Sequence, residues 1–548
     1  MKKLLSALLV VVILVTLIGC GKSDSNTNQT GPQSSEASKT TADKPAESSE
    51  LQEPPYKMSI YMPLVGSNIL KSHAEIEAFN IIAERTNVEL EWMHPPIGQE
   101  DETFNIMVAS GDYPDAIYHR WTNYPGGATK AIADNFLIDL SVYMDEHTPY
   151  LNQLFKDYPD IARQAVLDDG RLAFMPAAAN DLRRRAFDGY LIRQDWLDKL
   201  KLDMPTTIEE FYNVLSAFKT NDPNGNNKAD EIPLVTDQTS NKIGGYLRSL
   251  ASAWGVRDGF QLHPDTGKVI YGPIQPEFKE YLKEMNKWYN EGLIDKEFAS
   301  IDRKMTESKI TSNIVGTFRG NTASFEQFMN LMSSNVEGVS WRGIPFPTLG
   351  DKPNYAFDEN RVRLVWGQGV GVTTSCKNVE AVLRFLDYGY SEEGYDFYGW
   401  GVEGKSYVKE NGEYKLTDII TNDPTGLAST GAILRYGLGN NGYAKVHNFG
   451  FWSATELGNE PAKSANELWF KADNSLLLPL LSLTDEESIE FAKIMNEVTT
   501  YFDETYFKMI MGVVPISDFD TFAETVNKMK IDRAVEIQQA AYDRYLAR

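Results

Sequence analysis

Hydrophobic and polar positions in the first part of the chain follow the spacing of strands and of helices in turn. Strands are predicted at residues 57–62, 88–92 and 116–118, and helices at residues 72–86 and 104–110 between them. Parallel strands need crossover connections, and a β-α-β-α-β order supplies them. The pattern therefore predicts an α/β fold in which helices cover a parallel sheet.

The pattern resumes at residue 190, with a short strand at 190–192 and a helical turn at 195–200. Thr207 and Glu210 then have the spacing of a capping box, in which a hydroxyl and a carboxylate satisfy backbone amides at the start of a helix. Apolar residues recur at helical spacing after it, namely Ile208, Phe211, Val214, Leu215 and Phe218. This stripe predicts that the helix packs on a core.

Later in the chain, the same two periodicities predict strands at 269–271 and 362–372 and helices at 246–254, 278–291, 379–390 and 531–546. Gly367, Gly369 and Gly371 fall within the second of these strands, where glycine permits close approach of another backbone. No internal repeat is visible. A chain of 548 residues exceeds a single hydrophobic core, which predicts at least two lobes.

The helix after Thr207 runs into a loop whose side-chain oxygens recur at alternate positions. The oxygen-bearing residues are Asp222, Asn224, Asn226, Asp230 and Glu231, and Lys228 falls where a backbone carbonyl usually serves as a ligand. Calcium takes about six to eight oxygen ligands, and a tightly turned loop supplies them in this way. The EF-hand pattern is only partly met, because Asn227 replaces its glycine and Pro233 replaces its last glutamate. We interpret the loop as a calcium site; the alternative is an Asn/Asp/Gly turn that ends the helix.

The N-terminus has the pattern of an export signal followed by a lipid attachment point. Lys2 and Lys3 precede an apolar run over residues 8–15, and Gly19 and Cys20 follow it. A positive start, a short apolar segment and a small residue before the cut are typical of a signal peptide, and the cysteine matches the bacterial lipobox. We predict cleavage before Cys20, a diacylglycerol on its sulfur and an acyl chain such as palmitate on its amine. The alternative is an ordinary signal peptide with an incidental cysteine.

Residues 20–55 contain no aromatic residue, and Leu51 is their only large aliphatic one. Such a composition cannot bury enough apolar surface to fold, so we predict a disordered tether. The formal charge of −24 becomes −26 once the two lysines of residues 1–19 are removed, which argues against nucleic acid as a partner. Cys376 is the only cysteine besides Cys20, so no internal disulfide is expected and we interpret it as a buried, inert thiol.

Several short segments together resemble one known family. They are GDYPD at 111–115, DWLDKL at 195–200, PTT at 205–207, the loop at 222–231, KWYNEGLIDKE at 287–297 and GVEGK at 401–405. They resemble the extracellular solute-binding proteins of bacterial ABC sugar importers. The nearest group is the large oligosaccharide-binding lipoproteins, whose relatives include alginate-binding proteins. The resemblance implies a two-lobed, periplasmic-binding-protein-like fold of type II, with a hinge, a cleft between the lobes and a structural calcium ion.

Under this resemblance, residues 56–180 form an N-lobe completed by about 345–410, and residues 181–344 form a C-lobe completed by about 411–548. In such clefts, aromatic faces stack on sugar rings while polar side chains bond the hydroxyls. By their positions near strand ends and turns, the candidate ligand residues are Trp121, Trp254, Arg319, Trp366 and Tyr436. Core packing is the alternative role for each of them.

The predicted function is the membrane-anchored, extracellular binding component of an ABC importer. It would act as a monomer that captures a carbohydrate, closes by a hinge and delivers the sugar to permease subunits. No HExxH, CxxC, GxSxG or P-loop motif points to an enzyme. The alternatives are a surface-anchored, calcium-stabilised polysaccharide hydrolase and a sugar-sensing subunit. We interpret the basic run Arg183–Arg185 as a solvated loop rather than an anion site.

Overall fold

The computed structural model of the protein describes residues 54–236, 245–358 and 361–548. Residues Pro54–Arg548 form one compact unit. The predicted signal segment, Cys20 and nearly all of the predicted tether lie outside the described residues. Among the described residues, no helix combines the length and the apolar character needed to cross a membrane.

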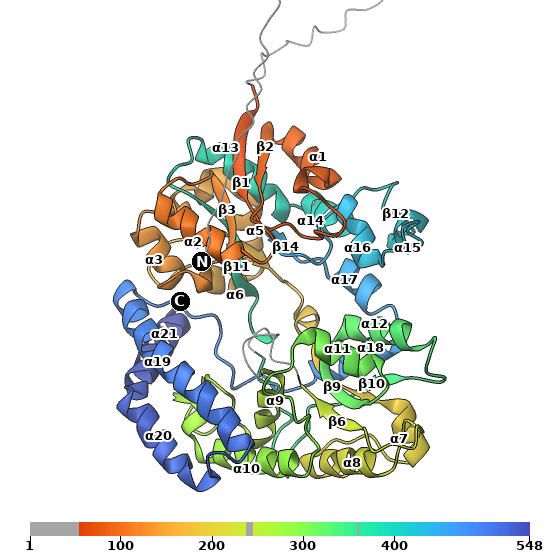
Figure 1. Cartoon of the computed structure of the whole chain (residues 1–548). Helices are drawn as coiled ribbons and strands as arrows, with labels where there is room; N and C mark the ends of the chain where they lie inside the picture. The colour runs from red at the N-terminus through yellow and green to blue at the C-terminus, as the bar shows by residue number, and fades with distance from the viewer. Residues whose placement is uncertain (1–53, 237–244, 359–360) are drawn as a thin grey trace, which may run out of the picture. The chain divides into compact units, whose positions relative to one another are not determined.

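Six strands form the first sheet, in the order β14-β4-β11-β3-β1-β2. Their bounds are β1 Tyr56–Tyr61, β2 Val88–Met93, β3 Ala116–Arg120, β4 Met175–Ala178, β11 Val365–Val372 and β14 Lys445–Val446. Strand β1 pairs in parallel with both β2 and β3, which confirms the parallel arrangement predicted from the first elements. Strand β11 runs antiparallel to β3 and β4, and the two-residue strand β14 closes the edge in parallel with β4 (Figure 1).

Helices α1 (Glu77–Arg85), α6 (Pro159–Ala165) and α13 (Val379–Asp387) pack against strands of this sheet. Phe79 and Ile82 of α1 are fully buried, as their spacing predicts. Gly369 of β11 shows why this strand is rich in glycine, because a Cβ there would lie 2.1 Å from the carbonyl oxygen of Met175. Cys376 follows β11 and is half-buried rather than buried as predicted, and burial raises the pKa of its thiol to about 11.

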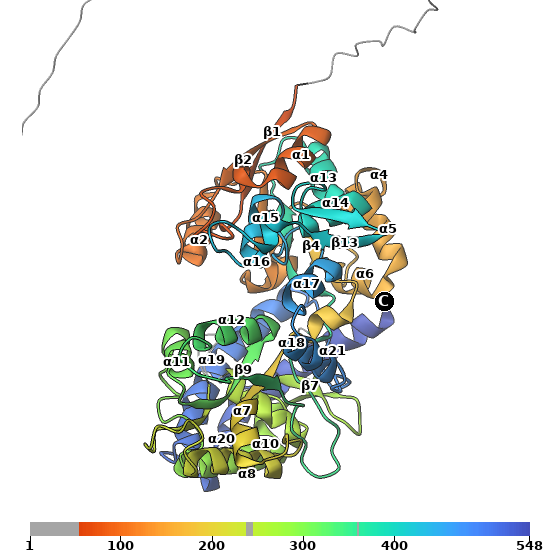
Figure 2. The same ribbon diagram turned by 90° about the vertical axis from the view of Figure 1, so that its right-hand side faces the viewer.

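The second sheet has four strands in the order β10-β5-β9-β6. Their bounds are β5 Asp188–Arg193, β6 Ile232–Val235, β9 Val315–Asn321 and β10 Trp341–Gly343. Helices α8 (Ile208–Thr220), α12 (Thr322–Met332) and α18 (Glu460–Phe470) pack on it, and Figure 2 shows α12 and α18 beside β9. The predicted capping box of α8 is present, with Glu210 donating its amide to Thr207 Oγ1 at 3.1 Å and accepting from the Thr207 amide at 3.1 Å.

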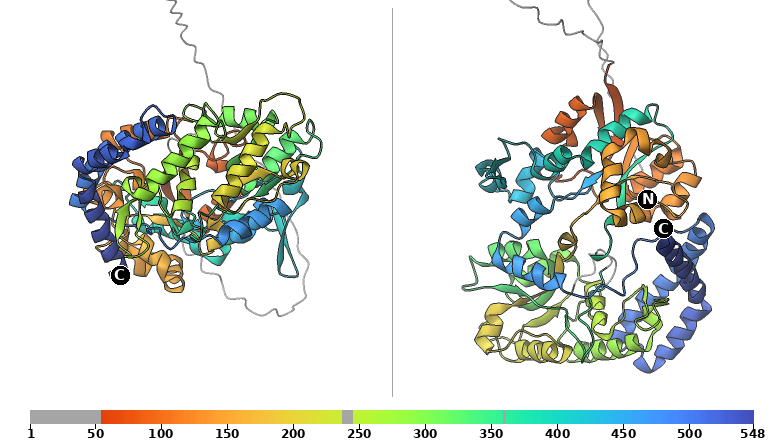
Figure 3. Two further views of the ribbon diagram at one scale, coloured as in Figure 1. Left: turned by 90° about the horizontal axis from the view of Figure 1, so that it is seen from below. Right: turned by 180° about the vertical axis from the view of Figure 1, so that it is seen from behind.

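A group of long helices extends the core of the second sheet. Helix α19 (Asp485–Ile510) packs on α10 (Pro276–Asn290) and α21 (Ile531–Ala547), and α20 (Phe519–Lys528) connects α19 to α21. Figure 3 shows these C-terminal helices in dark blue. Tyr281 of α10 and Tyr506 of α19 share a buried hydroxyl–hydroxyl hydrogen bond of 2.8 Å. The sequence pattern predicts α10 and α21, whereas α19 is not among the predicted elements.

Further helices and two ribbons complete the described residues. The remaining α-helices are α2 Glu100–Ser110, α3 Gly127–Ala133, α4 Met144–His147, α5 Pro149–Asp157, α7 Gln194–Leu200, α9 Gly245–Arg248, α11 Arg303–Thr311, α14 Glu392–Trp400, α15 Asp418–Thr421, α16 Ser429–Ala432 and α17 Phe449–Glu456. Two-stranded ribbons pair β7 (Phe260–Leu262) with β8 (Val269–Tyr271) and β12 (Tyr407–Glu410) with β13 (Glu413–Leu416).

Candidate functional site

Arg319, one of the five predicted ligand residues, lies on β9 and is already paired. Its Nη2 donates to Asp188 Oδ2 at 2.5 Å and to Asp358 Oδ2 at 3.3 Å. Asp188 lies at the start of the neighbouring strand β5, and burial raises the pKa of its carboxyl while Arg319 and Arg361 oppose that shift. The guanidinium of Arg319 therefore serves first to neutralise two carboxylates.

Arg361, which precedes β11, makes hydrogen bonds beside the Arg319–Asp188 ion pair. Its Nη1 donates to the carbonyl oxygen of Trp469 at 2.8 Å, and its Nη2 donates to the carbonyl oxygen of Asp188 at 3.3 Å. Arg361 lies just before β11 of the first sheet, whereas Asp188 and Trp469 belong to the second sheet and to α18 packed on it. Buried hydrogen bonds thus hold the segment just before β11 against the second sheet and α18.

Trp366, the second predicted ligand residue, lies on β11 and is half-buried. The Arg185 guanidinium carbon lies 4.3 Å from the centre of its ring, and that of Arg184 lies 5.6 Å away. The His447 ring meets Trp366 edge-on, with 3.9 Å between the ring centres. Lys445 of β14 is fully buried and donates to the carbonyl oxygen of Gly439 at 2.7 Å. Trp366 therefore stands beside a concentration of basic side chains.

The prediction that Arg183–Arg185 form a solvated loop is wrong for two of the three residues. Arg183 is exposed and pairs with Asp181 at 2.6 Å, but Arg184 and Arg185 are only 8% and 1% exposed. They lie on the short 3-10 turn Leu182–Arg185 between β4 and β5. Side chains of β11 and α17, far away in the sequence, bury them, so the local charge pattern could not show this.

Trp121, the third candidate, is a core residue of the first sheet in this structure. It is fully buried and donates its indole N–H to the carbonyl oxygen of Gly369 at 3.1 Å. Phe104 and Phe136 contact its ring edge-on or at a tilt. Of the two roles considered for Trp121, these contacts support packing.

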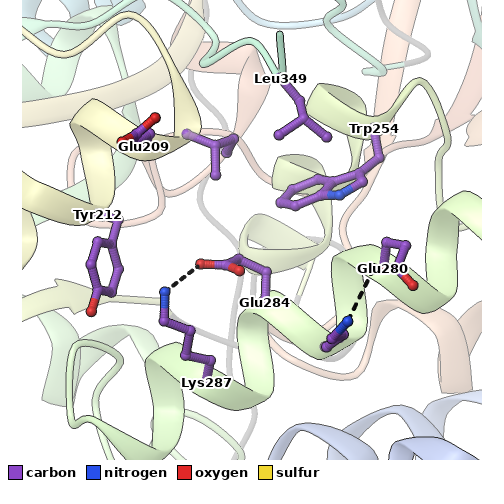
Figure 4. A pocket seen from close by; sticks show the side chains of 9 residues that line it. Glu209, Tyr212, Trp254, Glu280, Glu284, Lys287 and Leu349 are labelled. Atoms are coloured by element: carbon purple, nitrogen blue, oxygen red, sulfur yellow. Dashed lines mark hydrogen bonds and ion pairs between the residues drawn. The ribbon is translucent and has the colours of Figure 1, made fainter.

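Trp254, the fourth candidate, lies against the second sheet's helices and is 6% exposed. It borders a pocket of about 440 Å³, which is also lined by Tyr212 of α8 and by Glu280, Glu284 and Lys287 of α10 (Figure 4). Lys287 pairs with Glu284 at 3.3 Å and lies 3.8 Å from the centre of the Tyr212 ring. None of the other predicted ligand residues lines this pocket.

Tyr436, the fifth candidate, follows the 3-10 turn Ile433–Arg435 and is half-buried. It packs against a small cluster that includes Trp400 and Phe451. Its carbonyl oxygen accepts the amide of Ala78 at 3.1 Å, which ties this segment to α1.

The structure therefore connects two of the five predicted residues, Arg319 and Trp366. The other three, Trp121, Trp254 and Tyr436, lie apart from them. Asp358 accepts from Arg319, and its charge also acts on Arg185, which stacks on Trp366. Arg184, Arg185, Lys445 and His447 are not among the predicted site residues. The run of three arginines at residues 183–185 is a local signal for the first two of them.

The predicted calcium loop folds back on itself around its polar side chains. Asp222 accepts the amides of Asn226 and Asn227, both at 3.1 Å, and Asn224 accepts the Asn226 amide at 3.0 Å. The side-chain amides of Asn224 and Asn226 donate to Asp230 at 3.1 and 3.0 Å. Asn227 adopts the left-handed conformation with φ of 57°, which asparagine tolerates in place of glycine.

The side chain of Glu231 bears on whether this loop fits a cation. Its Oε1 is buried and has no hydrogen-bond partner among the described residues, and burial together with Asp222 and Asp230 raises the pKa of its carboxyl. The charges of Asp222 and Asp230 act on Glu231, and a loop with such neighbouring carboxylates and one unsatisfied oxygen is chemically suited to a hard divalent cation. The described residues contain no tight cluster of three or more His, Cys, Asp or Glu side chains, so the donor set depends on the amide oxygens as well.

Comparison with known proteins places these features in context. The sequence model described as bacterial extracellular solute-binding protein matches residues 71–396. Lipoprotein LipO of Bacillus subtilis (strain 168) is 27% identical over 350 residues, which is 60% of this chain and 62%, less than two thirds, of LipO. The fructooligosaccharide ABC transporter substrate-binding protein FusA of Streptococcus pneumoniae serotype 4 is 24% identical over 493 residues, covering 85% and 86% of the two chains.

Solved structures show the same fold. The alginate-binding protein AlgQ2, determined without calcium ion, has a TM-score of 0.72 at 23% identity and covers 90% of this chain and 98% of its own. FusA in complex with kestose has a TM-score of 0.72 at 21% identity, covering 90% and 99%, and an EF-hand mutant of FusA has 0.71 at 20%, covering 90% and 99%. These likenesses confirm the predicted α/β, periplasmic-binding-protein-like fold.

Proposed function

Because the chain belongs to the family of bacterial extracellular solute-binding proteins, we propose that it is the carbohydrate-binding component of an ABC importer. It captures an oligosaccharide between two lobes, closes by a hinge and delivers the sugar to permease subunits as a monomer. The observation that carries this proposal is the match to FusA, a fructooligosaccharide-binding transporter component, over 85% of the chain in sequence and 90% in fold.

The two sheets support a division into two lobes. Strands β1–β4 and β11 lie in one sheet and β5, β6, β9 and β10 in the other, close to the predicted boundaries near residues 180 and 345. Strand β14 pairs with β4, so we propose that the chain around Lys445–Val446 returns to the N-lobe rather than staying in the C-lobe. The hinge then comprises the crossings before β5, before β11 and around β14.

For the ligand cleft, we favour Trp366 among the predicted residues. Its ring is half-buried at the junction of the two sheets, so part of it is accessible for stacking on a sugar. Arg319 is connected to this region by its hydrogen bond to Asp358. We propose that it orients neighbouring polar groups and is not by itself the contact with the sugar. Trp121 and Trp254 pack in the cores, and Tyr436 supports the turn beside α1.

The binding role is preferred to the hydrolase alternative because the family and the relatives named above are binding proteins. The second alternative is that the sugar-bound protein acts as a sensor and not in transport. Loss of sugar uptake on deletion of the gene would support transport, whereas unchanged uptake with a lost transcriptional response would support sensing.

We also propose that the loop at 222–231 holds a structural calcium ion away from the sugar. Asp222, Asn224, Asn226, Asp230 and Glu231 would supply side-chain oxygens and Lys228 its carbonyl oxygen, and a bound ion would neutralise the carboxylates of the loop. The unsatisfied oxygen of Glu231 supports this assignment, as does the EF-hand named for the structural relative FusA.

The mature protein is proposed to sit on the outer face of the cell membrane, attached through lipid on Cys20. The extracellular family and the similarity to a lipoprotein of Bacillus subtilis support this location. Labelling cells with a radioactive fatty acid tests it: the wild-type chain should be labelled and a Cys20→Ser chain should not.

The function itself is tested with the purified chain that begins after Cys20. Binding is measured by calorimetry against a panel of neutral and acidic oligosaccharides, and the sugars are then recovered and analysed by chromatography. Binding with intact sugar recovered supports the proposal. Release of shorter sugars would instead establish a hydrolase, and no binding to any oligosaccharide would refute the carbohydrate assignment.

A further inference from the structure

The basic group around Trp366 contains buried positive charge that no hydrogen-bonded carboxylate of the described residues neutralises. We define the Arg185 cluster as Arg184, Arg185, Lys445, His447, Trp366 and Trp452. All three guanidinium nitrogens of Arg185 lack a hydrogen-bond partner among the described residues, although the residue is only 1% exposed. Both ring nitrogens of His447 and the indole nitrogen of Trp452 are buried and unpartnered as well. The cluster is therefore rich in donors that no acceptor of the described chain satisfies.

The acidic side chains among the described residues whose charges act on the two arginines are bound to other groups. Glu456, whose charge acts on Arg184, accepts from Thr322 and from Asn440, both at 2.9 Å. Asp358, whose charge acts on Arg185, accepts from Arg319 at 3.3 Å. Neither carboxylate makes a hydrogen bond to the arginine that it influences, so among the described residues no carboxylate bonds directly to either arginine.

Such burial is unfavourable unless an anion joins the group. Burial, with Arg184 and Arg363 beside it, lowers the pKa of Arg185 well below its usual value. A guanidinium nevertheless keeps its proton in proteins, so proton loss does not relieve the burial. Stacking on Trp366 at 4.3 Å offsets only part of the desolvation of five N–H donors.

We propose that the Arg185 cluster is an anion-binding subsite that accepts a carboxylate of an acidic oligosaccharide. A guanidinium fork bonds both oxygens of a carboxylate, which gives geometry as well as charge. Trp366 is the partly exposed member of the cluster, so a ligand approaches from its side and meets an aromatic face beside the cation. A sugar ring that carries a carboxylate matches this pair of features, whereas a free inorganic oxyanion uses the guanidinium alone.

This inference rests on the proposed function and names its class of ligand. It is tested by calorimetry with a set of uronate oligosaccharides, each paired with its carboxyl-reduced, neutral derivative. The wild-type protein should bind at least one uronate about tenfold or more tightly than its neutral partner, because one charge-assisted pair is lost on reduction. Added sodium chloride should weaken binding of the uronate more than that of the neutral sugar.

Two variants locate the effect. Arg185→Met removes the charge but keeps the packing on Trp366, and the preference for the uronate should fall to within about twofold. Arg183→Met is the matched control, because Arg183 is exposed on the same turn, and it should keep the preference. Should Arg185→Met fail to fold, the paired sugars and the salt series on the wild-type protein still decide the question.

The outcomes separate this inference from the proposed function. Equal or tighter binding of the neutral sugars overturns the inference and leaves the importer role standing. Sulfate or phosphate binding that depends on Arg185, without any preference among the sugars, also overturns it in favour of a free-anion site. No binding of any oligosaccharide refutes the proposed function itself.

Discussion

Arg319 Nη2 lies 2.5 Å from Asp188 Oδ2. Both side chains are buried, and they belong to β9 and β5, which are adjacent strands of the second sheet. Breaking a buried ion pair by removing one partner leaves a charge without compensation, which costs about 3 kcal/mol or more. We therefore expect Asp188→Asn to lower the free energy of unfolding by about 3 kcal/mol, since Asp358 still pairs weakly with Arg319. Urea denaturation followed by tryptophan fluorescence measures this change.

The control for this prediction is Asp181→Asn. Asp181 pairs with Arg183 at 2.6 Å, but the Arg183 side chain is 54% exposed. Exposed pairs contribute about 0–1 kcal/mol, so this variant should unfold almost like the wild type. Equal losses in the two variants would show that the Asp188 pair contributes no more than an exposed one.

Lys445 gives the protein a stability that changes with pH. Burial, with Arg184 nearby, lowers the pKa of the Lys445 amine from 10.5 to about 7. The unfolded chain then binds more protons than the folded chain between pH 7 and 10.5, so this group makes the protein more stable as the pH rises through that range. The charged groups that act on Lys445 and its neighbour His447 are Arg184 and Arg185, which do not titrate there.

The test compares the wild type with Lys445→Met in denaturant titrations at several pH values from 7 to 9.5. The variant lacks the titrating amine, so its stability relative to the wild type should be highest at pH 7 and should decline as the pH rises. A difference that stays constant with pH would show that the amine of Lys445 keeps its ordinary pKa in the folded protein.

Calcium should raise the melting temperature of the protein. A ligand at about 100 times its dissociation constant stabilises the folded state by about 2.7 kcal/mol, which corresponds to several degrees for a chain of this size. Chelator should therefore lower the melting temperature measured by differential scanning fluorimetry. Asp230→Asn should weaken or abolish the response, because Asp230 lies at the centre of the loop's hydrogen bonds.

Asp203→Asn is the matched control for the loop, because Asp203 is an exposed carboxylate a short distance before it in the sequence. This variant should respond to calcium as the wild type does. An identical melting temperature of the wild type with calcium and with chelator would identify residues 222–231 as a plain turn.

The sequence predicts those parts of the fold that depend on local spacing. The helix after Thr207 and its capping box follow from residues within a few positions of one another, and the parallel pairing of β1 with β2 and β3 follows from alternating elements. Strand β14 has only two residues and pairs with β4 from more than 260 positions away, so no local period reveals it. Burial of Arg184 and Arg185 has the same origin, because Trp366 and Trp452 cover them from distant segments.

Trp366 and Trp254 should have different roles in the protein. Trp366 is half-buried at the junction of the sheets, whereas Trp254 is 6% exposed against α10 and contacts Tyr281 with 5.6 Å between the ring centres. Trp366→Ala should weaken oligosaccharide binding by about 2 kcal/mol or more, as loss of a central aromatic contact does. Trp254→Ala should instead lower the free energy of unfolding by about 3–5 kcal/mol, as expected for a truncated core residue.

Calorimetry and urea denaturation on both variants distinguish these two roles, because each residue should affect one measurement far more than the other. If Trp254→Ala loses affinity while it keeps its stability, the pocket between α8 and α10 is where the sugar binds. If neither variant loses affinity, the aromatic contact with the sugar comes from a residue other than these two tryptophans. An affinity loss confined to Trp366→Ala would place the sugar against β11, next to Arg185 and at the boundary between the two sheets, where closing of the lobes can sense it.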